Sequence, residues 1–412
     1  MIRDIIREAF TAMMHNRRRT GLTMLGMAWG IATVVLLLAY GGGFRNAIQG
    51  IFAQWGTNNI GVFPGRTSMQ AGGINAGVPV RLMLDDIDRI AATVANVKHI
   101  SPMVQMRVRA QRDVRMHEAI TTGSFASFQH IRALKVAEGR FFTEGENVSD
   151  ARVVVLAPEA KQKLFSNGFA VGESIRINGI SFEVIGILEP KPQEGNSNIN
   201  ERMYIPFGTM GLLRDINYID GIFMTFEGNG FAAEDSVRAS LAEYHRFRQD
   251  DRRAVFIFNS ARRMQVFDMV TLSLQAMLGF IGMLTLGIGG VGVANIMLVS
   301  VNQRTREIGM LRAVGARRRD VLLQFLGEAL VITIAGGLLG VVLAFLVVWS
   351  LGPLTLYSAM AKYGSAGDIR LVISTNILVV STGVLALIGL VCGMVPAIKA
   401  AAIDPIEALR YE

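Results

Sequence analysis

The sequence predicts an α+β membrane protein with four transmembrane helices and a large extracytoplasmic α/β domain between the first and second helices. Of its 412 residues, 51% are hydrophobic and only 18% are charged, a balance typical of membrane proteins. Four stretches lack charge and exceed the roughly 20 residues that a helix needs to cross a bilayer. They are 20–44, 269–303, 329–361 and 371–398. Core helices of a soluble protein seldom run so long without charge.

The N-terminal residues 1–19 are expected to form a cytoplasmic amphipathic helix. Its apolar side chains recur at helical spacing on one face: Ile2, Ile5, Ile6, Ala9, Phe10 and Met13. Such a helix before a span lies in the membrane interface, although a solvated helix docked on a partner fits the same pattern. The first span, 20–44, is longer than the apolar part of a signal peptide, so we expect an uncleaved anchor.

Lysine and arginine residues near the spans predict the orientation, because cytoplasmic flanks carry an excess of them. They gather before the first span, between the second and third, and after the fourth: Arg3, Arg7, Arg17, Arg18, Arg19, Arg304, Arg306, Arg312, Arg317, Arg318, Arg319, Lys399 and Arg410. Both termini are therefore expected in the cytoplasm and the spans in contact with membrane lipid. The net charge of +8 is then mainly a topology signal, and nucleic acid is not expected as a partner.

The region 45–266 is expected to fold outside the membrane around its own core. Its patterns follow the order β-α-β over 59–110 and again over 221–258, which predicts a porter-like split α/β sandwich with a strand-rich insertion at about 113–218. The rest of the chain is assigned to a second transmembrane helix with a stalk (267–303), a cytoplasmic coupling helix (304–322), a third transmembrane helix (323–352), a short extracytoplasmic loop (353–372), a fourth transmembrane helix (373–398) and a cytoplasmic tail (399–412).

No catalytic, metal or cofactor site is predicted in this chain. Gly287-Ile-Gly289-Gly-Val-Gly292 matches a dinucleotide-binding pattern, but it follows no strand and lies inside a span. A phosphate-binding loop needs a Gly-Lys dipeptide, which the sequence lacks, so another chain would have to bind ATP. The histidines show no metal-ligand spacing, and the pair His117-Glu118 is expected in a solvated loop. The chain is therefore not expected to be an enzyme.

Glycine pairs four residues apart inside the spans predict close helix packing, because small residues let two backbones approach. The pairs are Gly26/Gly30, Gly336/Gly340 and Gly389/Gly393. Charge inside the spans is nearly absent, so no path for cargo through these helices is expected. Glu328 lies at the cytoplasmic end of the third span, where it either pairs with an arginine of the 304–319 loop or reaches the interface alone.

The segment Asn295–Asp320, NIMLVSVNQRTREIGMLRAVGARRRD, changes abruptly from an apolar helix to a basic amphipathic one. On a cytoplasmic face, such a block indicates a surface that passes force or information to a soluble partner. Together with Arg18–Ala32, Gly56–Gly65 and Pro396–Arg410, it resembles the permease of macrolide-exporter-type (MacB-like) ABC transporters, in the wider FtsX/LolC-like superfamily. Because the chain starts shortly before its first span, it resembles the versions without a fused ATPase domain.

The resemblance implies an assembly in the bacterial inner membrane. Two permeases, identical or paralogous, associate and bind ABC ATPase subunits, which carry the ATP and Mg. A periplasmic adaptor protein and an outer-membrane channel often complete the pump. The residues expected to couple to the ATPase are Arg304, Arg306, Glu307, Ile308, Gly309, Arg312, Ala313, Gly315, Ala316 and Arg317.

The expected function is that of an efflux permease for drugs, peptides or lipids, which passes ATP-driven movement to its periplasmic domain. Two alternatives come from the same superfamily. One is a lipoprotein-releasing permease of the LolC/E type, and the other is an FtsX-like regulator of cell-wall hydrolases.

Overall fold

The computed structural model describes residues 17–56, 58–71, 73, 75–94, 96–192, 198–352, 363 and 368–410. The chain divides into two compact units. A helical unit comprises 1–46, 269–354 and 369–412, and an α/β unit comprises 47–268 and 355–368. The predicted helix at 1–19 and the loop at 353–372 lie mostly outside the described residues.

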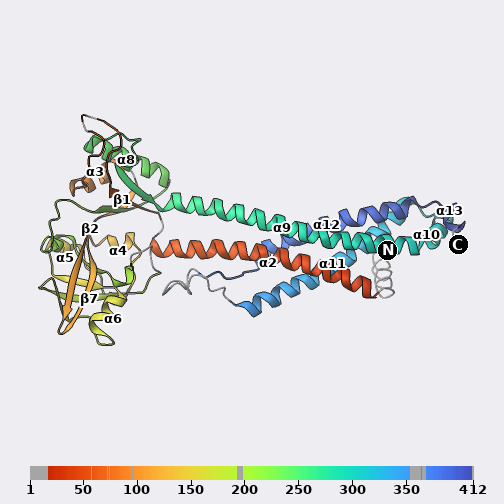
Figure 1. Cartoon of the computed structure of the whole chain (residues 1–412), viewed down its shortest axis with the longest axis horizontal. Coiled ribbons are helices and arrows are strands. Elements are labelled where there is room, and N and C mark those ends of the chain that lie inside the picture. The colour runs from red at the N-terminus through yellow and green to blue at the C-terminus, as the bar shows by residue number, and fades with distance from the viewer. Residues whose placement is uncertain are drawn as a thin grey trace. The chain divides into compact units, whose positions relative to one another are not determined.

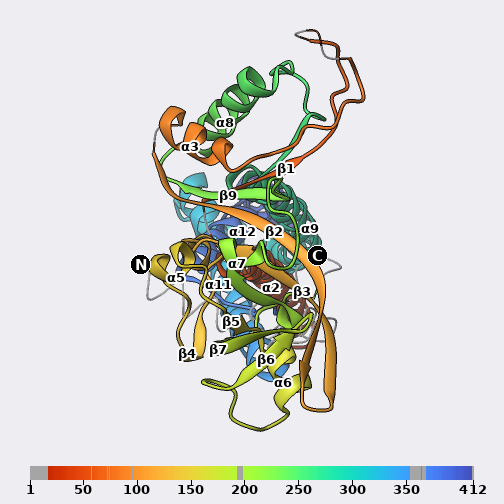
Figure 2. The same cartoon turned by 90° about the vertical axis from the view of Figure 1, so that its left-hand side faces the viewer.

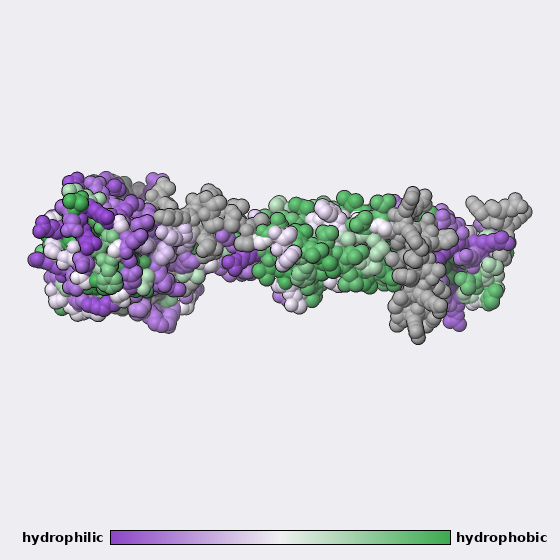
Figure 3. Space-filling view, turned by 90° about the horizontal axis from the view of Figure 1, so that it is seen from below, coloured by the Kyte–Doolittle hydropathy of each residue, from purple (hydrophilic) through white to green (hydrophobic). Residues whose placement is uncertain are grey.

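Within the described part of the chain, four helices are long and apolar enough to cross a membrane (Figure 1), which confirms the predicted class of multi-pass membrane protein. They are α2 (Arg17–Trp55), α9 (Ser260–Gln303), α11 (Arg318–Leu351) and α12 (Thr375–Ala402). Two short helices, α10 (Thr305–Ala313) and α13 (Pro405–Arg410), follow α9 and α12. The surface of the helical unit is hydrophobic along the middle of the helices, and hydrophilic residues gather toward the end that carries α10 and α13 (Figure 3).

Each of the long helices contributes to one hydrophobic core in the helical unit. Met27 and Ile31 of α2, Leu286 of α9, Phe325 of α11 and Leu385 of α12 are all buried in it. Large parts of the same helices remain exposed and apolar, as expected for surfaces that face lipid. α2 and α9 are longer than the predicted spans because they continue into the α/β unit.

The α/β unit is built on one ten-stranded sheet. Its strands are β1 (Asn59–Pro64), β2 (Val97–Arg112), β3 (Arg115–Ser124), β4 (Val136–Gly139), β5 (Val153–Leu156), β6 (Ser174–Ile177), β7 (Ile180–Leu188), β8 (Met203–Pro206), β9 (Gly221–Phe226) and β10 (Val255–Asn259). The order is β10-β1-β9-β2-β3-β8-β5-β7-β4, and β6 pairs with β2 and β7. The pairs β3/β8 and β5/β7 are parallel, and the other pairs are antiparallel.

The predicted split β-α-β arrangement is confirmed. α3 (Asp85–Thr93) joins β1 to β2, α8 (Gly230–His245) joins β9 to β10, and β9 lies between β1 and β2 in the sheet. Figure 2 shows α3 and α8 together over the part of the sheet that holds β1 and β9. His245 Nε2 lies 3.0 Å from the buried Asp86 carboxylate and so links the two helices.

The strand-rich insertion holds β3 to β8 and four short helices. The helices are α4 (Phe128–Ile131), α5 (Glu144–Val148), α6 (Pro158–Phe165) and α7 (Phe207–Met210), with a 3-10 turn at Ile199–Glu201. The predicted solvated loop at His117-Glu118 is wrong, because both residues lie in β3 and the His117 side chain is buried. Burial, together with the charge of Lys163, lowers the pKa of His117, which is therefore neutral at pH 7.

Lys191 holds the end of α2 within the α/β unit. Its buried ammonium donates to the carbonyl oxygens of Gln54 (2.7 Å) and Arg132 (2.5 Å). These carbonyls end α2 and α4, where a cation also compensates the negative end of the helix dipole. The Lys191 backbone is itself held, because its N–H and C=O bond to the side-chain amide of Asn200.

A second polar anchor lies at the start of α5. The Thr143 hydroxyl accepts a hydrogen bond from the Glu146 N–H, while the Glu146 carboxylate accepts one from the Thr143 N–H. Arg140 donates to both oxygens of the same carboxylate at 2.7 Å. This capping box satisfies backbone donors that the first turn of a helix leaves unpaired.

Replacing Glu146 with Gln should destabilise the α/β unit at neutral pH more than in acid. Hydrogen bonds from Arg140 and Thr143 lower the pKa of Glu146 from 4.5 to about 2. The ionised form therefore contributes its full stability above about pH 4.5 and loses it as the pH falls through about 2. With the side chain 21% exposed, we expect a cost of about 1–2 kcal/mol at pH 7. Unfolding of the full chain in detergent at pH 7 and pH 3 measures it, and a pH-independent cost would contradict this account.

Replacing Lys191 with Met should destabilise the α/β unit by about 2–3 kcal/mol, because two carbonyls at helix ends would lose their partner. The matched control is Lys163→Met, which removes an exposed pair with Glu201 and should cost less than about 1 kcal/mol. Chemical unfolding of the full chain compares the two variants. Equal losses of unfolding free energy in the two variants would contradict a stabilising role for the buried Lys191 ammonium.

Candidate functional site

The candidate site is α10, the short helix in the basic segment between α9 and α11. A single residue, Arg304, separates it from α9, and its backbone leaves the helical conformation there (φ −102°, ψ 13°). Gly315, just beyond the helix, has φ +110°, a left-handed value that favours glycine after a helix end. The structure thus divides the predicted 304–322 helix into α10, a turn and the first residues of α11.

One face of α10 packs on α13. Gly309 and Ala408 of α13 are buried in this contact, whereas Ile308 is buried in the hydrophobic core of the helical unit. A Cβ atom on Gly309 would lie 2.5 Å from the Cβ of Ala408, closer than two such atoms can approach. The glycine is therefore what allows the two helices to pack so closely.

Arg312 fixes α10 to the end of α12. Its Nη1 donates to the carbonyl oxygens of Ala401 (3.4 Å) and Ile403. The last carbonyls of a helix lack intrahelical partners, and an arginine there also complements the helix dipole. This predicted coupling residue is thus held within the chain.

Arg304 fixes the start of α10 to α11. Its Nη1 lies 2.9 Å from Oε1 of Glu328, whose side chain is only 2% exposed. Of the two interpretations of Glu328 left open by the sequence, the structure selects pairing with an arginine of the loop. Breaking the pair would leave a buried carboxylate without its cation, which is costly.

The opposite side of α10 is open. It carries both charged and apolar side chains, and we call it the open face: Arg306, Glu307, Met310, Leu311, Ala313 and Val314. Val314 is 92% exposed, and the exposed arginines Arg317, Arg318 and Arg319 follow directly. Apolar side chains surrounded by cations are typical of a surface that a partner covers.

The predicted coupling residues therefore separate into two groups. One group packs within the chain, wholly or in part: Arg304, Ile308, Gly309, Arg312 and Ala316. The other is exposed: Arg306, Glu307, Ala313, Gly315 and Arg317. The open face also holds Met310, Leu311 and Val314, which are not among the predicted coupling residues, although three apolar residues at i, i+1 and i+4 in a basic segment are a helical pattern.

Two of the predicted packing glycines bring α11 onto α2. A Cβ on Gly336 would lie 2.9 Å from the Cβ of Met27, and one on Gly340 would meet the Ala28 carbonyl oxygen and Ile31. Since a backbone carbonyl cannot swing aside as a side chain can, Gly340 is the stricter of the two positions.

The other pairs pack differently. Gly389 and Gly393 of α12 face α11. A Cβ on Gly389 would lie 2.8 Å from Cγ2 of Thr333, and one on Gly393 would lie 2.7 Å from the Cβ of Ala329. Gly30 of α2 faces Leu286 of α9 at 2.9 Å.

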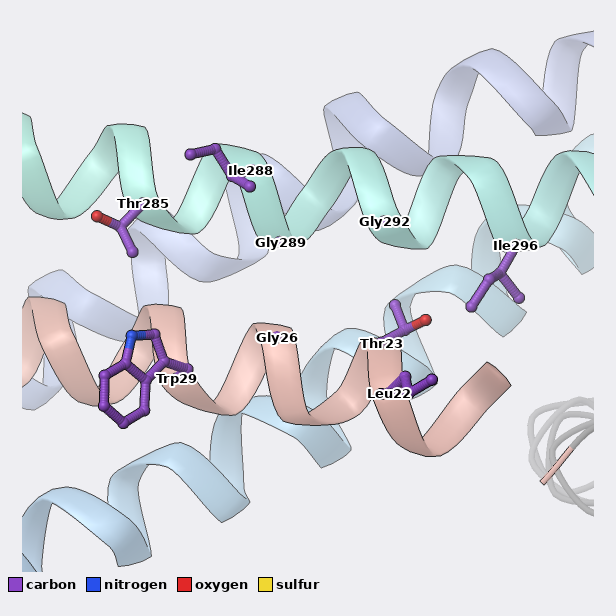
Figure 4. A pocket seen from close by; sticks show the side chains of 9 residues that line it. All are labelled: Leu22, Thr23, Gly26, Trp29, Thr285, Ile288, Gly289, Gly292 and Ile296. Carbon is purple, nitrogen blue, oxygen red and sulfur yellow. The ribbon is translucent and has the colours of Figure 1, made fainter. Parts of the chain in front are cut away.

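Gly26 instead borders a groove between α2 and α9 (Figure 4). No atom lies within 4 Å of a Cβ placed on it, although its carbonyl oxygen lies 3.2 Å from a Cβ placed on Gly289. Trp29 and Ile288 form part of the groove wall and are largely exposed. The missing side chain of Gly289, and not that of Gly26, is therefore what lets the two backbones approach here.

Among the residues that the structure describes, no group of three or more His, Cys, Asp or Glu side chains could hold a metal ion. The candidate site is a helix that is fixed on one side and open on the other.

Replacing Gly309 with Val should push α10 away from α13, because the new side chain overlaps Ala408. We expect amide hydrogen exchange in α13 to rise at least about tenfold, as local opening becomes easier. The matched control is Ala313→Val, which adds a bulkier β-branched side chain to the exposed face of the same helix. Exchange in α13 that is equal in the two variants would show that Gly309 does not set this contact.

Two family models match the chain. The MacB-like periplasmic core domain matches residues 20–244, and the FtsX-like permease C-terminal domain matches residues 279–405. The macrolide export ATP-binding/permease protein MacB of Bdellovibrio bacteriovorus is 34% identical over 99% of this chain and 61% of its own length. The pyoverdine export ATP-binding/permease protein PvdT of Pseudomonas putida is 32% identical over 99% and 60%. The chain thus spans about three fifths of the length of these curated relatives.

Among solved structures, the periplasmic region of MacB from Actinobacillus actinomycetemcomitans aligns with a TM-score of 0.43 and 22% identity, over 54% of this chain and 95% of that one. The two family models together cover most of the chain, with the MacB-like match alone exceeding half of it. This chain belongs to the MacB-like family of ABC transporter permeases, in which a MacB-like periplasmic core domain is followed by an FtsX-like permease domain.

Proposed function

We propose that this chain is the permease part of an ABC-type efflux transporter and that the open face of α10 is its docking surface for an ATPase. The observation that carries the proposal is the contrast between the two sides of α10. One side is fixed by Gly309, Arg312 and Arg304 to three other helices, and the other presents Val314 at 92% exposure.

The fixed side supports transmission of movement. Because α10 is tied to α11, α12 and α13, a partner that shifts α10 must also shift the helices to which it is bound. α9 is continuous from Ser260 to Gln303 and follows β10 directly. Its 44 residues correspond to a helix of about 66 Å at 1.5 Å per residue. We therefore propose that ATP-driven movement at α10 is passed along α9 to the α/β domain.

The proposal places the chemistry of ATP and Mg on the ATPase and assigns no catalytic step to this chain. The lysine and arginine residues around α10 and α13 support a cytoplasmic location for this end of the helices. The relatives are named for the export of macrolides and pyoverdine. From these names we propose that this chain takes part in the export of a drug, peptide or lipid from the periplasm across a bacterial envelope. A second permease, a periplasmic adaptor and an outer-membrane channel are the further proposed partners.

Val314→Asp tests the docking surface. A carboxylate at the centre of an apolar contact must lose its hydration on binding, so we expect about tenfold weaker capture of the ATPase, with a matching loss of stimulated ATP hydrolysis. The matched control is Val114→Asp, at 93% exposure in the turn between β2 and β3. Co-purification from native membranes and the ATPase rate after reconstitution are the measurements.

Two results would overturn the docking proposal. One is ATPase capture by the Val314→Asp variant at the level of the wild type and of the Val114→Asp control. The other is the absence of any ATPase that co-purifies with the unaltered chain. Exchange of α13 amides at the wild-type rate verifies that the Val314 variant keeps α10 in place.

A further inference from the structure

A buried carboxylate, that of Glu234, joins the start of α9 to α8. Glu234 lies in the second turn of α8, and its side chain is 11% exposed. Its Oε2 accepts hydrogen bonds from Nε of Arg262 in the first turn of α9 (3.0 Å) and from Nδ2 of Asn259 at the end of β10 (3.1 Å). One oxygen atom thus links α8, β10 and α9.

The Asn259 side chain adds a second link between the same elements. Its Nδ2 also donates to the Gly230 carbonyl oxygen at the start of α8 (2.7 Å), while its Oδ1 accepts from the Ala261 N–H (3.0 Å). An asparagine that accepts from the first N–H groups of a helix acts as its N-terminal cap. Asn259 therefore ties the first turn of α9 to the first turn of α8.

Close packing accompanies these hydrogen bonds. A Cβ placed on Gly230 would lie 2.9 Å from the Cβ of Ala261, so the two helix starts are in contact. The Arg262 guanidinium also lies over the Phe231 ring of α8, with 4.8 Å between its Cζ and the ring centre. Arg262 is thus held to α8 by its charge and by its flat face.

The carboxylate is the strongest part of this joint, because it pairs with cations and is nearly removed from water. Arg262 is its close partner, and Nη2 of Arg238 lies 3.9 Å from its Oε1. Hydrogen bonds between ionised groups are roughly twice as strong as those between neutral groups. If α9 moved away from α8, Glu234 would lose the Arg262 cation while still largely buried, which is costly. Movement of α9 without α8 is therefore disfavoured.

α8 is in turn tied to α3. The Arg89 guanidinium of α3 lies over the Tyr244 ring of α8, with 3.8 Å between its Cζ and the ring centre. Together with the contact between His245 and Asp86, this holds the two helices as one layer over the sheet (Figure 2). A displacement of α8 would thus displace α3 as well.

We propose that Glu234 is a positioning residue that makes α8, and α3 with it, follow the start of α9 as one cooperative unit. Chain connectivity alone would pass a movement of α9 to β10, which precedes it directly. The joint at Glu234 passes it to the helical layer over the sheet as well. This inference rests on the proposed function only for the cause of the movement, and its test needs no ATPase.

Hydrogen exchange in the full chain, in nanodiscs at increasing urea concentration, tests the joint. In the unaltered chain, the amides of 230–238 and 260–267 should open with the same urea dependence, as one cooperative unit does. Glu234→Gln keeps the shape of the side chain and removes its charge. Exchange in 260–267 should then become about tenfold faster and separate from that in 230–238. The matched control is Glu243→Gln, at an exposed position of the same helix, which should behave as the unaltered chain does.

Arg262→Gln, alone and combined with Glu234→Gln, shows whether the two residues act through each other. Each single variant should raise exchange in 260–267 about tenfold. The double variant should stay near tenfold, whereas independent effects would multiply to about a hundredfold. Unchanged exchange in the central strand β3 verifies that each variant keeps its fold.

Two results would overturn the joint. One is multiplication of the two single effects in the double variant. The other is a different urea dependence of 230–238 and 260–267 in the unaltered chain. Since neither ATP nor an ATPase is present, failure of ATPase docking would leave both measurements unaffected.

Discussion

The structure depends on the inability of hydrocarbon to hydrogen-bond a protein backbone. This constraint makes every span a helix and moves the polar interactions that fix the spans to the helix ends. Arg312 binds carbonyls at the end of α12, Arg304 neutralises Glu328 in α11, and Lys191 binds the last carbonyls of α2 and α4. Between these ends, packing relies on glycine contacts such as that of Gly340 with Ala28.

At α10, the cations Arg304 and Arg312 hold the chain together on one side. The open face, proposed above for docking, exposes Met310, Leu311 and Val314 beside Arg306 and Glu307. Contact there would depend on shape and dehydration, with Arg317 to Arg319 contributing longer-range attraction.

Much of the fold could be predicted because its signals are local. Absence of charge located the spans, and the β-α-β patterns over 59–110 and 221–258 located the two halves that hold β1, α3 and β2 and then β9, α8 and β10. The strand β3 was not predicted, because the buried His117 follows the charged Arg115 and precedes the exposed Glu118, a pattern that resembles a loop. The open face could not be predicted in full, because the burial of Gly309 depends on where the distant α13 packs, and that of Ile308 on the core formed by the long helices. The end of α10 did carry a local signal in Gly315.

The contact between Gly309 and Ala408 has a consequence for the evolution of this family. The two positions, almost a hundred residues apart in the chain, share one small volume between α10 and α13. A larger residue at position 309 is tolerable only if position 408 becomes smaller, because a Cβ on Gly309 would lie 2.5 Å from the Cβ of Ala408. The pair should therefore covary among homologous chains, with the sum of the two side-chain volumes held nearly constant while each residue drifts.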